Sequence, residues 1–383
     1  MKKTILLFFL IIFSFSACSK QEWHGSVKKE NGITIVSNPQ TGAWEDRKDR
    51  NIKFVKKDSI GKPDGPDEYL FAYIVDIEVN RKGEIFVADR QMNNVRKFDQ
   101  SGKFLLSIGQ KGKGPGEFES IKIISLDNAD NLLVFDNMLG RVSVFSADGA
   151  FLKSKDNLIP NSWISPAEIF VKGEYYIFFA KIRNRSGLFH GFDKNWHYSF
   201  SFGKYEFIDN KEFEEFNLGF WPGQCYSGND GSIFYTKYYY DNRIFVYQDT
   251  VLKKIIRRDS DIKVPYEVTV MHDVKKAMDM QKDRKYDFYS FGQGIAFVGY
   301  SFQTSAGIFQ LNDGRIVNFI HVRKSKQKRE FGVELYDKTG KFLQYAKLGE
   351  NTWYTIFCKD ANDAFYTVDR KGFPKVLKFE ITD

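Results

Sequence analysis

Residues 109–118 read GQKGKGPGEF, and residues 61–69 read GKPDGPDEY. Each segment follows the dipeptide Ser-Ile and precedes an apolar stretch that ends in a turn. The two dipeptides begin at Ser59 and Ser107, 48 residues apart, which is about the length of one four-stranded blade of a β-propeller. The spacing therefore predicts a ring of similar blades.

A second pattern, a Gly, Asn or Asp turn followed by a short strand rich in aromatic and β-branched residues, recurs six times. The copies are GEIFVAD at 83, DNLLVFD at 130, GEYYIFF at 173, DGSIFYT at 230, DGRIVNF at 313 and NDAFYTVD at 362. Short strands bounded by such turns are typical of β-hairpins. We therefore predict an all-β fold, a six-bladed β-propeller of four-stranded antiparallel blades.

The two ends of the chain are expected to close the ring. The last blade reaches only the strand expected at 375–381, so it lacks an outermost strand. Residues 52–60 align with the outermost strands of the other blades and can fill that place. Pairing this N-terminal strand with the last blade removes the open sheet edges that promote aggregation.

Three regions are expected along the chain: a signal peptide at 1–17, a lipidated N-terminus and tether at 18–50, and the propeller at 51–383. The propeller contains an insertion at about 259–291, between the fourth and fifth copies of the repeated strand. Apolar residues from Val270 to Met278 follow helical spacing, which predicts a helix there. Two roles are open to this insertion, a lid over the central channel or a decorated loop.

The N-terminus carries an export signal. Lys2 and Lys3 precede an apolar run from Ile5 to Phe15 that is too short to span a bilayer. The run ends in Phe-Ser-Ala-Cys, which resembles the lipobox of bacterial lipoproteins. That resemblance implies that Cys18 carries the lipid anchor, and that Ser19 directs the protein to the outer membrane, on its periplasmic or cell-surface face.

The blade motifs also resemble a known family. The GxGPGEF segment, the strands ending in Ala88-Asp89 or Phe135-Asp136, and the FDxxGKF-like hairpin at 98–104 are similar to those of NHL-like, six-bladed β-propeller lipoproteins of Bacteroidetes. The resemblance covers roughly residues 50–383. Most members have no assigned activity, so it implies the fold more than the function.

The cysteine count and the net charge limit the kinds of molecule that the protein can be expected to bind. The three cysteines include Cys18, and the remaining Cys225 and Cys358 are too few for a disulfide framework. We expect both to be buried on inner strands. The formal net charge is +8. For an exported lipoprotein this charge favours lipid head groups, acidic glycans or an acidic protein partner, and we expect no nucleic acid.

Loops that join the second strand of each blade to the third share one face with the connections between blades. These six loops hold fourteen basic and five acidic residues, which would focus a positive potential on that face. Arginine suits carboxylate or phosphate recognition, and aromatic rings suit sugars or protein anchors. The predicted ligand-binding residues are Arg90, Arg183, Arg323, Arg370, Tyr239 and Trp221. The alternatives are a solvated basic rim and aromatic packing between blades.

Catalytic chemistry finds less support. Asp89, Asp136 and Asp369 recur at one position of the blade, which favours turn capping over catalysis. Asp76, on a predicted innermost strand, is the candidate channel carboxylate. We expect no metal, no cofactor and no catalytic residue.

The sequence as a whole predicts a binding or scaffold propeller anchored at the outer membrane, either a monomer or part of an envelope complex. It would recognise an anionic glycan, peptide or partner protein through its basic loops. The alternative is a metal-dependent hydrolase or lyase with its site in the central channel.

Overall fold

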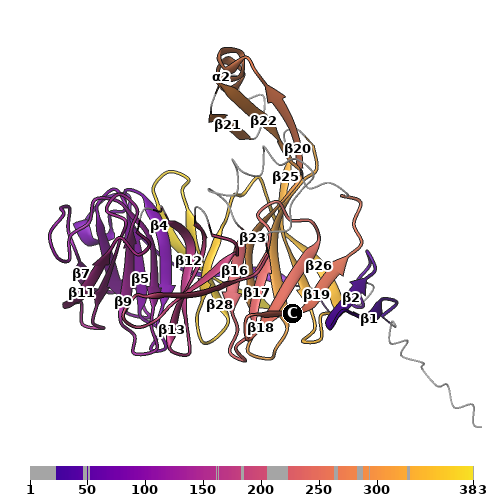
Figure 1. The fold of residues 1–383 in the computed structure, drawn as a ribbon, viewed down its shortest axis with the longest axis horizontal. Coiled ribbons are helices and arrows are strands. Elements are labelled where there is room, and N and C mark those ends of the chain that lie inside the picture. Colours follow the sequence, from indigo (N-terminus) through magenta and orange to yellow (C-terminus); the bar gives the residue numbers. More distant parts are fainter. Residues whose placement is uncertain are drawn as a thin grey trace, which may run out of the picture.

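The computed structural model describes residues 23–45, 50, 52–160, 162, 164–182, 185–204, 223–262, 266–282, 288–292, 294–325 and 328–382. Within these residues the chain forms a ring of six sheets, each built on a four-stranded antiparallel blade, with a small additional sheet above it (Figure 1). The predicted six-bladed propeller is confirmed.

Four blades are built from consecutive strands, ordered from the channel outwards. Blade one contains β4 (Ile74–Val79), β5 (Ile85–Asp89), β6 (Asn94–Phe98) and β7 (Phe104–Ile108), preceded by the short helix η1 (Asp67–Tyr69). Blade two contains β8 (Ile121–Leu126), β9 (Leu132–Asp136), β10 (Arg141–Phe145) and β11 (Phe151–Asp156). Blade three contains β12 (Ile164–Lys172), β13 (Tyr175–Ile182), β14 (Phe189–Phe192) and β15 (Tyr198–Phe202). Blade five contains β23 (Gln303–Gln310), β24 (Ile316–Arg323), β25 (Arg329–Tyr336) and β26 (Phe342–Glu350).

The other two blades recruit strands from the N-terminal part of the chain. Blade four contains β16 (Gln224–Ser227), β17 (Ile233–Thr236), β18 (Arg243–Gln248) and β19 (Val251–Arg258), extended by β2 (Ile33–Asn38) and β1 (Ser26–Glu30). Blade six contains β27 (Ile356–Lys359), β28 (Ala364–Asp369), β29 (Lys375–Thr382) and, outermost, β3 (Lys53–Ile60).

The ring closes through β3, as predicted. Leu377 pairs with Ser59 and Ile381 with Phe54 in an antiparallel ladder. The Phe54 ring stacks on Phe379 of β29 at 4.2 Å and also packs against Phe319 of blade five. The closing strand therefore joins blade six to blade five as well as completing its own sheet.

All six copies of the repeated strand are second strands of blades. In β5 and β9 every residue is buried, whereas every residue of the outermost β11 is exposed. A second strand lies in the middle of its sheet and both of its faces pack against neighbouring blades. The sequence of a second strand is therefore apolar throughout and does not alternate between apolar and polar residues.

Turns between the third and fourth strands hold adjacent blades together. Gly340 lies in the turn before β26 with φ of +97°, and a Cβ there would lie 2.7 Å from Cγ1 of Ile256 in blade four. Gly102, with φ of +81°, faces Ile60 of blade six in the same way. Only glycine combines this left-handed backbone with the close approach of a neighbouring strand.

Part of the expected tether is folded. We expected residues 18–50 to link the anchor to the propeller, yet 26–38 form the hairpin of β1 and β2, whose second strand pairs in parallel with β19. The buried Asn38 side chain accepts hydrogen bonds from the Trp23 indole and from the Phe342 backbone. The tether prediction was wrong here, because residues 33–36, Ile-Thr-Ile-Val, are all β-branched and favour a strand within an otherwise polar segment.

The insertion is larger than predicted. It contains β20 (Tyr266–Met271), α2 (Val274–Lys282), β21 (Phe288–Gly292) and β22 (Ile295–Ser301), and therefore extends to the start of β23. Val274 and Ala277 of the predicted helix pack on the small sheet, whereas Met278 is exposed. Figure 1 shows the insertion rising from the ring beside blades four and five. Among the described residues, no helix has the length and apolarity needed to cross a membrane.

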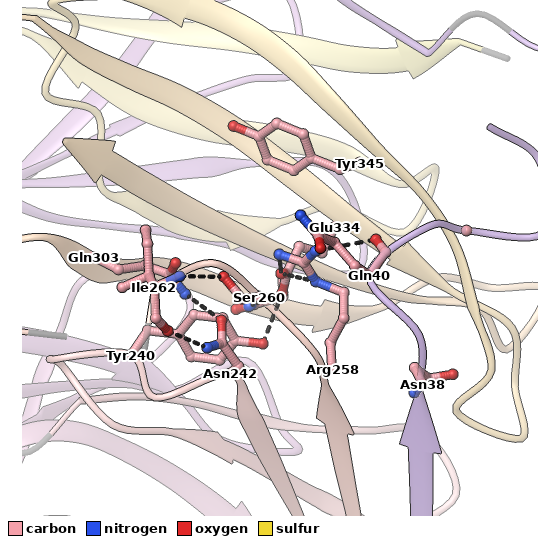
Figure 2. Close-up of polar contacts among 12 residues, drawn as sticks. Asn38, Gln40, Tyr240, Asn242, Arg258, Ser260, Ile262, Gln303, Glu334 and Tyr345 are labelled. Atoms are coloured by element: carbon pink, nitrogen blue, oxygen red, sulfur yellow. Dashed lines mark hydrogen bonds and ion pairs between the residues drawn. The ribbon is translucent and has the colours of Figure 1, made fainter. Parts of the chain in front are cut away.

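A network of polar side chains connects the two ends of the insertion where they join the ring (Figure 2). Asn242 bridges its two ends, since its amide group donates to the Ile262 carbonyl at 3.1 Å and its side-chain oxygen accepts from Gln303 at 2.9 Å. Arg258, just before the insertion, donates to the Gln40 carbonyl at 3.4 Å and to Glu334 at 2.8 Å. Arg258 thus connects the N-terminal segment and blade five to the start of the insertion.

Glu334 is the buried centre of this network. Its Oε1 accepts two hydrogen bonds from Arg258, and its Oε2 accepts from Tyr240, Asn318 and Tyr336. A buried carboxylate is tolerated only where a counter-charge and several donors replace water, and all of these are present. The network is therefore structural, and Tyr240 packs in the core between blades four and five.

Candidate functional site

The six predicted loops lie between the second and third strands, on the face where the connections between blades also lie. We call this the loop face; the insertion rises from it (Figure 1). Of the predicted site residues, Arg183 and Trp221 lie outside the described residues, as does the lipidation candidate Cys18. The structure places the remaining four in two clusters.

The first cluster forms where the ring closes. Arg90 follows β5 of blade one and Arg370 follows β28 of blade six. Their guanidinium carbons lie 5.7 and 5.6 Å from the centre of the Tyr73 ring. Tyr73 lies between β3 and β4 and is 45% exposed. Two positive charges that are distant in sequence therefore converge on one accessible aromatic side chain.

Backbone carbonyls hold both arginines in place. Arg90 Nε donates to the Ile121 carbonyl at 2.9 Å, and Arg370 Nη2 donates to the Ile74 carbonyl at 3.0 Å. Each guanidinium group has further N–H donors beyond these bonds. The arginines are thus oriented by the first strands of blades one and two.

Lys122 extends this cluster, and sequence reasoning missed it. It lies on β8, the innermost strand of blade two, and its Nζ donates to the Ser165 hydroxyl of blade three. Burial, together with the charge of Arg90, lowers the pKa of Lys122 to about 8. The signal in the sequence was a single lysine in an otherwise apolar strand, IKIISL.

The recurrent aspartates cap turns. Asp89 accepts hydrogen bonds from the backbone N–H groups of Ala72, Tyr73, Gln91 and Met92. Asp136 makes the equivalent four bonds one blade later. The capping prediction is confirmed for both, and Asp89 in addition positions Tyr73 between the arginines.

The second cluster lies between blade five and the end of the insertion. Arg323 lies over the Tyr300 ring at 5.2 Å and donates to the Ser301 carbonyl at 3.3 Å. Burial, and then the charge of Arg329, lowers the pKa of Arg323 to about 10. Tyr239 packs instead on Tyr266 at the foot of the insertion, with ring centres 4.7 Å apart. Tyr266 pairs with Ser301, whose carbonyl Arg323 contacts, so both predicted residues lie where the insertion joins the ring.

Arg329 and Trp353 complete the second cluster. The Arg329 guanidinium lies 4.6 Å from the centre of the Trp353 ring, and the His321 ring lies 5.1 Å from it. Trp353 remains 55% exposed. Burial, and secondarily the charge of Arg329, lowers the pKa of His321 to about 4, so this histidine is neutral at physiological pH.

Three carboxylates line the channel. Asp76, predicted there, lies on β4 with Glu78, and Glu168 lies on β12. Burial raises the pKa of Asp76 to about 7, and burial together with the neighbouring carboxylates raises the pKa values of Glu78 and Glu168. Blades one and three are not adjacent, so these charges interact across the channel.

Metal binding finds no support in the part of the chain that the structure describes. No group of three or more His, Cys, Asp and Glu side chains in it is arranged to hold an ion. Cys225 and Cys358 are free and lie on the innermost strands β16 and β27, as predicted; Cys358 is buried and Cys225 is partly exposed. Burial raises both thiol pKa values, which disfavours the reactive thiolate.

Comparison with known proteins identifies a family of propellers and solved structures of similar fold. The DUF5128 family, described as a 6-bladed beta-propeller, matches residues 64–299. A solved structure of a protein described as exported, from Bacteroides fragilis, is 15% identical with a TM-score of 0.56, over 91% of this chain and 99% of that chain. A DUF4221 family member from Bacteroides vulgatus is 11% identical with a TM-score of 0.59, over 87% and 99%. No curated protein matches the chain. At these identities the structural likeness concerns the fold alone.

Proposed function

The chain belongs to the DUF5128 family of six-bladed β-propellers, and from this premise we propose that it is a binding module. Its loop face would recognise an anionic glycan, peptide or partner protein. The observation that carries the proposal is the convergence of Arg90 and Arg370 on the exposed Tyr73, with Lys122 beside them. Loops on a rigid scaffold commonly carry binding sites.

The low pKa of Lys122 supports an anion site. Lys122 and Arg90 repel each other in a partly dehydrated place, which costs free energy when nothing is bound. An anion placed between them would remove that repulsion and gain charge-assisted hydrogen bonds. Relief of the repulsion between Lys122 and Arg90 would therefore add to the free energy of anion binding.

Replacement of Arg90 and Arg370 by Gln tests the proposal. Calorimetric titration with two probes, a polyuronate and poly-L-glutamate, should show binding of at least one to the wild type. We expect the double variant to lose about tenfold or more in affinity, because two charge-assisted contacts are removed. Salt should weaken wild-type binding more than variant binding.

The matched control is the double variant Arg81→Gln and Lys82→Gln. These exposed residues lie in the hairpin between β4 and β5, on the opposite face, and their loss changes the net charge equally. Equal weakening by the control would indicate attraction by overall charge alone. That result, or no binding of either probe, would contradict the proposal.

We also propose that the protein acts at the outer membrane, attached through Cys18. The lipobox-like sequence and the charged, apolar start of the chain support this address. Acylation at more than one position gives stable attachment without a spanning helix.

A second candidate function is a hydrolase or lyase in the channel. The observation that favours it is the group of Asp76, Glu78 and Glu168, because carboxyl groups with raised pKa values can exchange protons near neutral pH. A divalent metal bound at one equivalent per chain, and lost in a Glu168→Gln variant, would favour this function. The purified protein without such a metal would argue against it.

A further inference from the structure

Trp353 presents an accessible ring on the loop face. It lies in the connection between β26 and β27 and is 55% exposed, although Arg329 and His321 both pack against its ring. Tyr240, by contrast, is fully buried. Trp353 can therefore be contacted by a ligand from solvent while its covered side stays attached to the propeller.

The ring is also held in a defined orientation. Arg329 is 7% exposed, and its Nη1 and Nη2 donate to the carbonyl and hydroxyl of Ser301 at 3.2 and 3.4 Å. A guanidinium group fixed in this way offers a flat surface on which the indole stacks. A ligand that lands on Trp353 would consequently lose little additional side-chain freedom.

Positive charge borders the ring. Arg323 donates to the same Ser301 carbonyl that Arg329 contacts. Lys324 and Lys328, in the loop between β24 and β25, are exposed and form ion pairs with Glu330 at 4.0 Å and Glu350 at 3.0 Å. An apolar ring and several cationic groups thus meet within one small cluster formed by blade five, the end of the insertion and the connection to blade six.

We propose that Arg323, Arg329 and Trp353 form a binding subsite for the acidic sugars of a uronate-containing glycan. A hexuronate ring has an apolar C–H face and a carboxylate at its edge, which match an open indole bordered by guanidinium and ammonium groups. A peptide carries its carboxylates on flexible stems and offers no such ring face. This inference rests on the proposed function and narrows its ligand to an acidic carbohydrate.

The test compares three probes: a polyuronate, the same polymer with its carboxylates reduced to alcohols, and poly-L-glutamate. We expect the wild type to bind the polyuronate and to lose binding on carboxyl reduction. Trp353→Ala should weaken polyuronate binding roughly tenfold, since one aromatic stacking contact is removed. The same substitution should leave any poly-L-glutamate binding unchanged.

The control variant is Tyr175→Ala. Tyr175 is 37% exposed at the start of β13, on the face opposite the loops, so its removal should not affect the polyuronate. Equal affinity of Trp353→Ala and wild type for the polyuronate, or binding of poly-L-glutamate alone, would overturn the sugar subsite while leaving the proposed function intact. Binding of neither acidic probe would overturn both.

Discussion

Asp76 shows how one residue in the channel couples folding to pH. Its carboxylate oxygens accept backbone hydrogen bonds from Ile77 and from Ile124, and the second of these links blade one to blade two. Burial nevertheless dominates and raises its pKa to about 7. The folded protein therefore favours the protonated acid at pH values where the unfolded chain is ionised.

This pKa predicts a pH-dependent stability. A carboxyl group with a raised folded pKa stabilises the fold fully below its unfolded pKa, near 4, and loses that contribution as the pH rises to about 7. Asp76→Asn should therefore reduce the decline in unfolding free energy between pH 4 and 8 by roughly 1 to 4 kcal/mol. Urea unfolding at several pH values measures the slope.

Asp99→Asn serves as the control for Asp76→Asn. Hydrogen bonds from Ser101 and Lys103 lower the pKa of the exposed Asp99, so its contribution to stability changes only below about pH 4. The slope between pH 5 and 8 should match the wild type. A slope equally unchanged in Asp76→Asn would show that Asp76 is ionised in the fold.

At the scale of single elements, β3 decides whether the ring is closed. Its residues are mostly exposed, so burial of the strand itself contributes little. The contribution comes from its ladder with β29 and from Phe54, which contacts Phe379 in blade six and Phe319 and Phe331 in blade five. One side chain of a mainly polar strand thus connects two blades.

Phe54→Ala should lower the free energy of unfolding by about 2–4 kcal/mol, because it removes a partly buried ring from this contact. Val55→Ala, on the same strand, is the comparison. Val55 is 37% exposed, and its truncation should cost less than about 1 kcal/mol. Denaturant unfolding of the two variants would refute the role of Phe54 if both gave the same small loss.

At the scale of the whole molecule, the N-terminal segment runs along the outside of three blades. It extends blade four through β2 and then lies along β26 of blade five, where Ala43 and Trp44 donate to the Phe342 and Leu343 carbonyls. It completes blade six through β3. An anchor at the N-terminus would therefore be attached to half of the ring rather than to one flexible end.

The proposed anchor leads to a prediction for the whole protein. Cys18→Ala should move it from the membrane fraction to the soluble fraction of the exporting cell, because no acyl chain can be added. Fractionation and immunoblotting measure this, with Ser19→Ala as the control that keeps the thiol. Retention of the Cys18→Ala protein in the membrane fraction would contradict lipid anchoring.

The sequence by itself determined the number of blades, the strands within them, the closing strand and the capping role of Asp89. These features depend on local periodicity and on turn residues, which recur in every blade and can be recognised in the sequence without a structure. The helix of the insertion was predicted for the same reason, but only from Val274 onward is the prediction right, since Val270 and Met271 lie in β20. The β-branched run at residues 33–36 also favours a strand locally, but its pairing with β19 depends on the folded ring.

Only the tertiary structure decided which charged side chains meet. Arg90 and Arg370 come together because the ring closes between them, and Glu78 reaches Glu168 because two inner strands face each other across the channel. Tyr239 precedes the insertion and Arg323 follows it, yet both reach the same strand pair, because Tyr239 contacts Tyr266, and Tyr266 pairs with Ser301, which Arg323 contacts. Such contacts depend on the curvature of the whole ring and on the path of the insertion, and no local pattern records either.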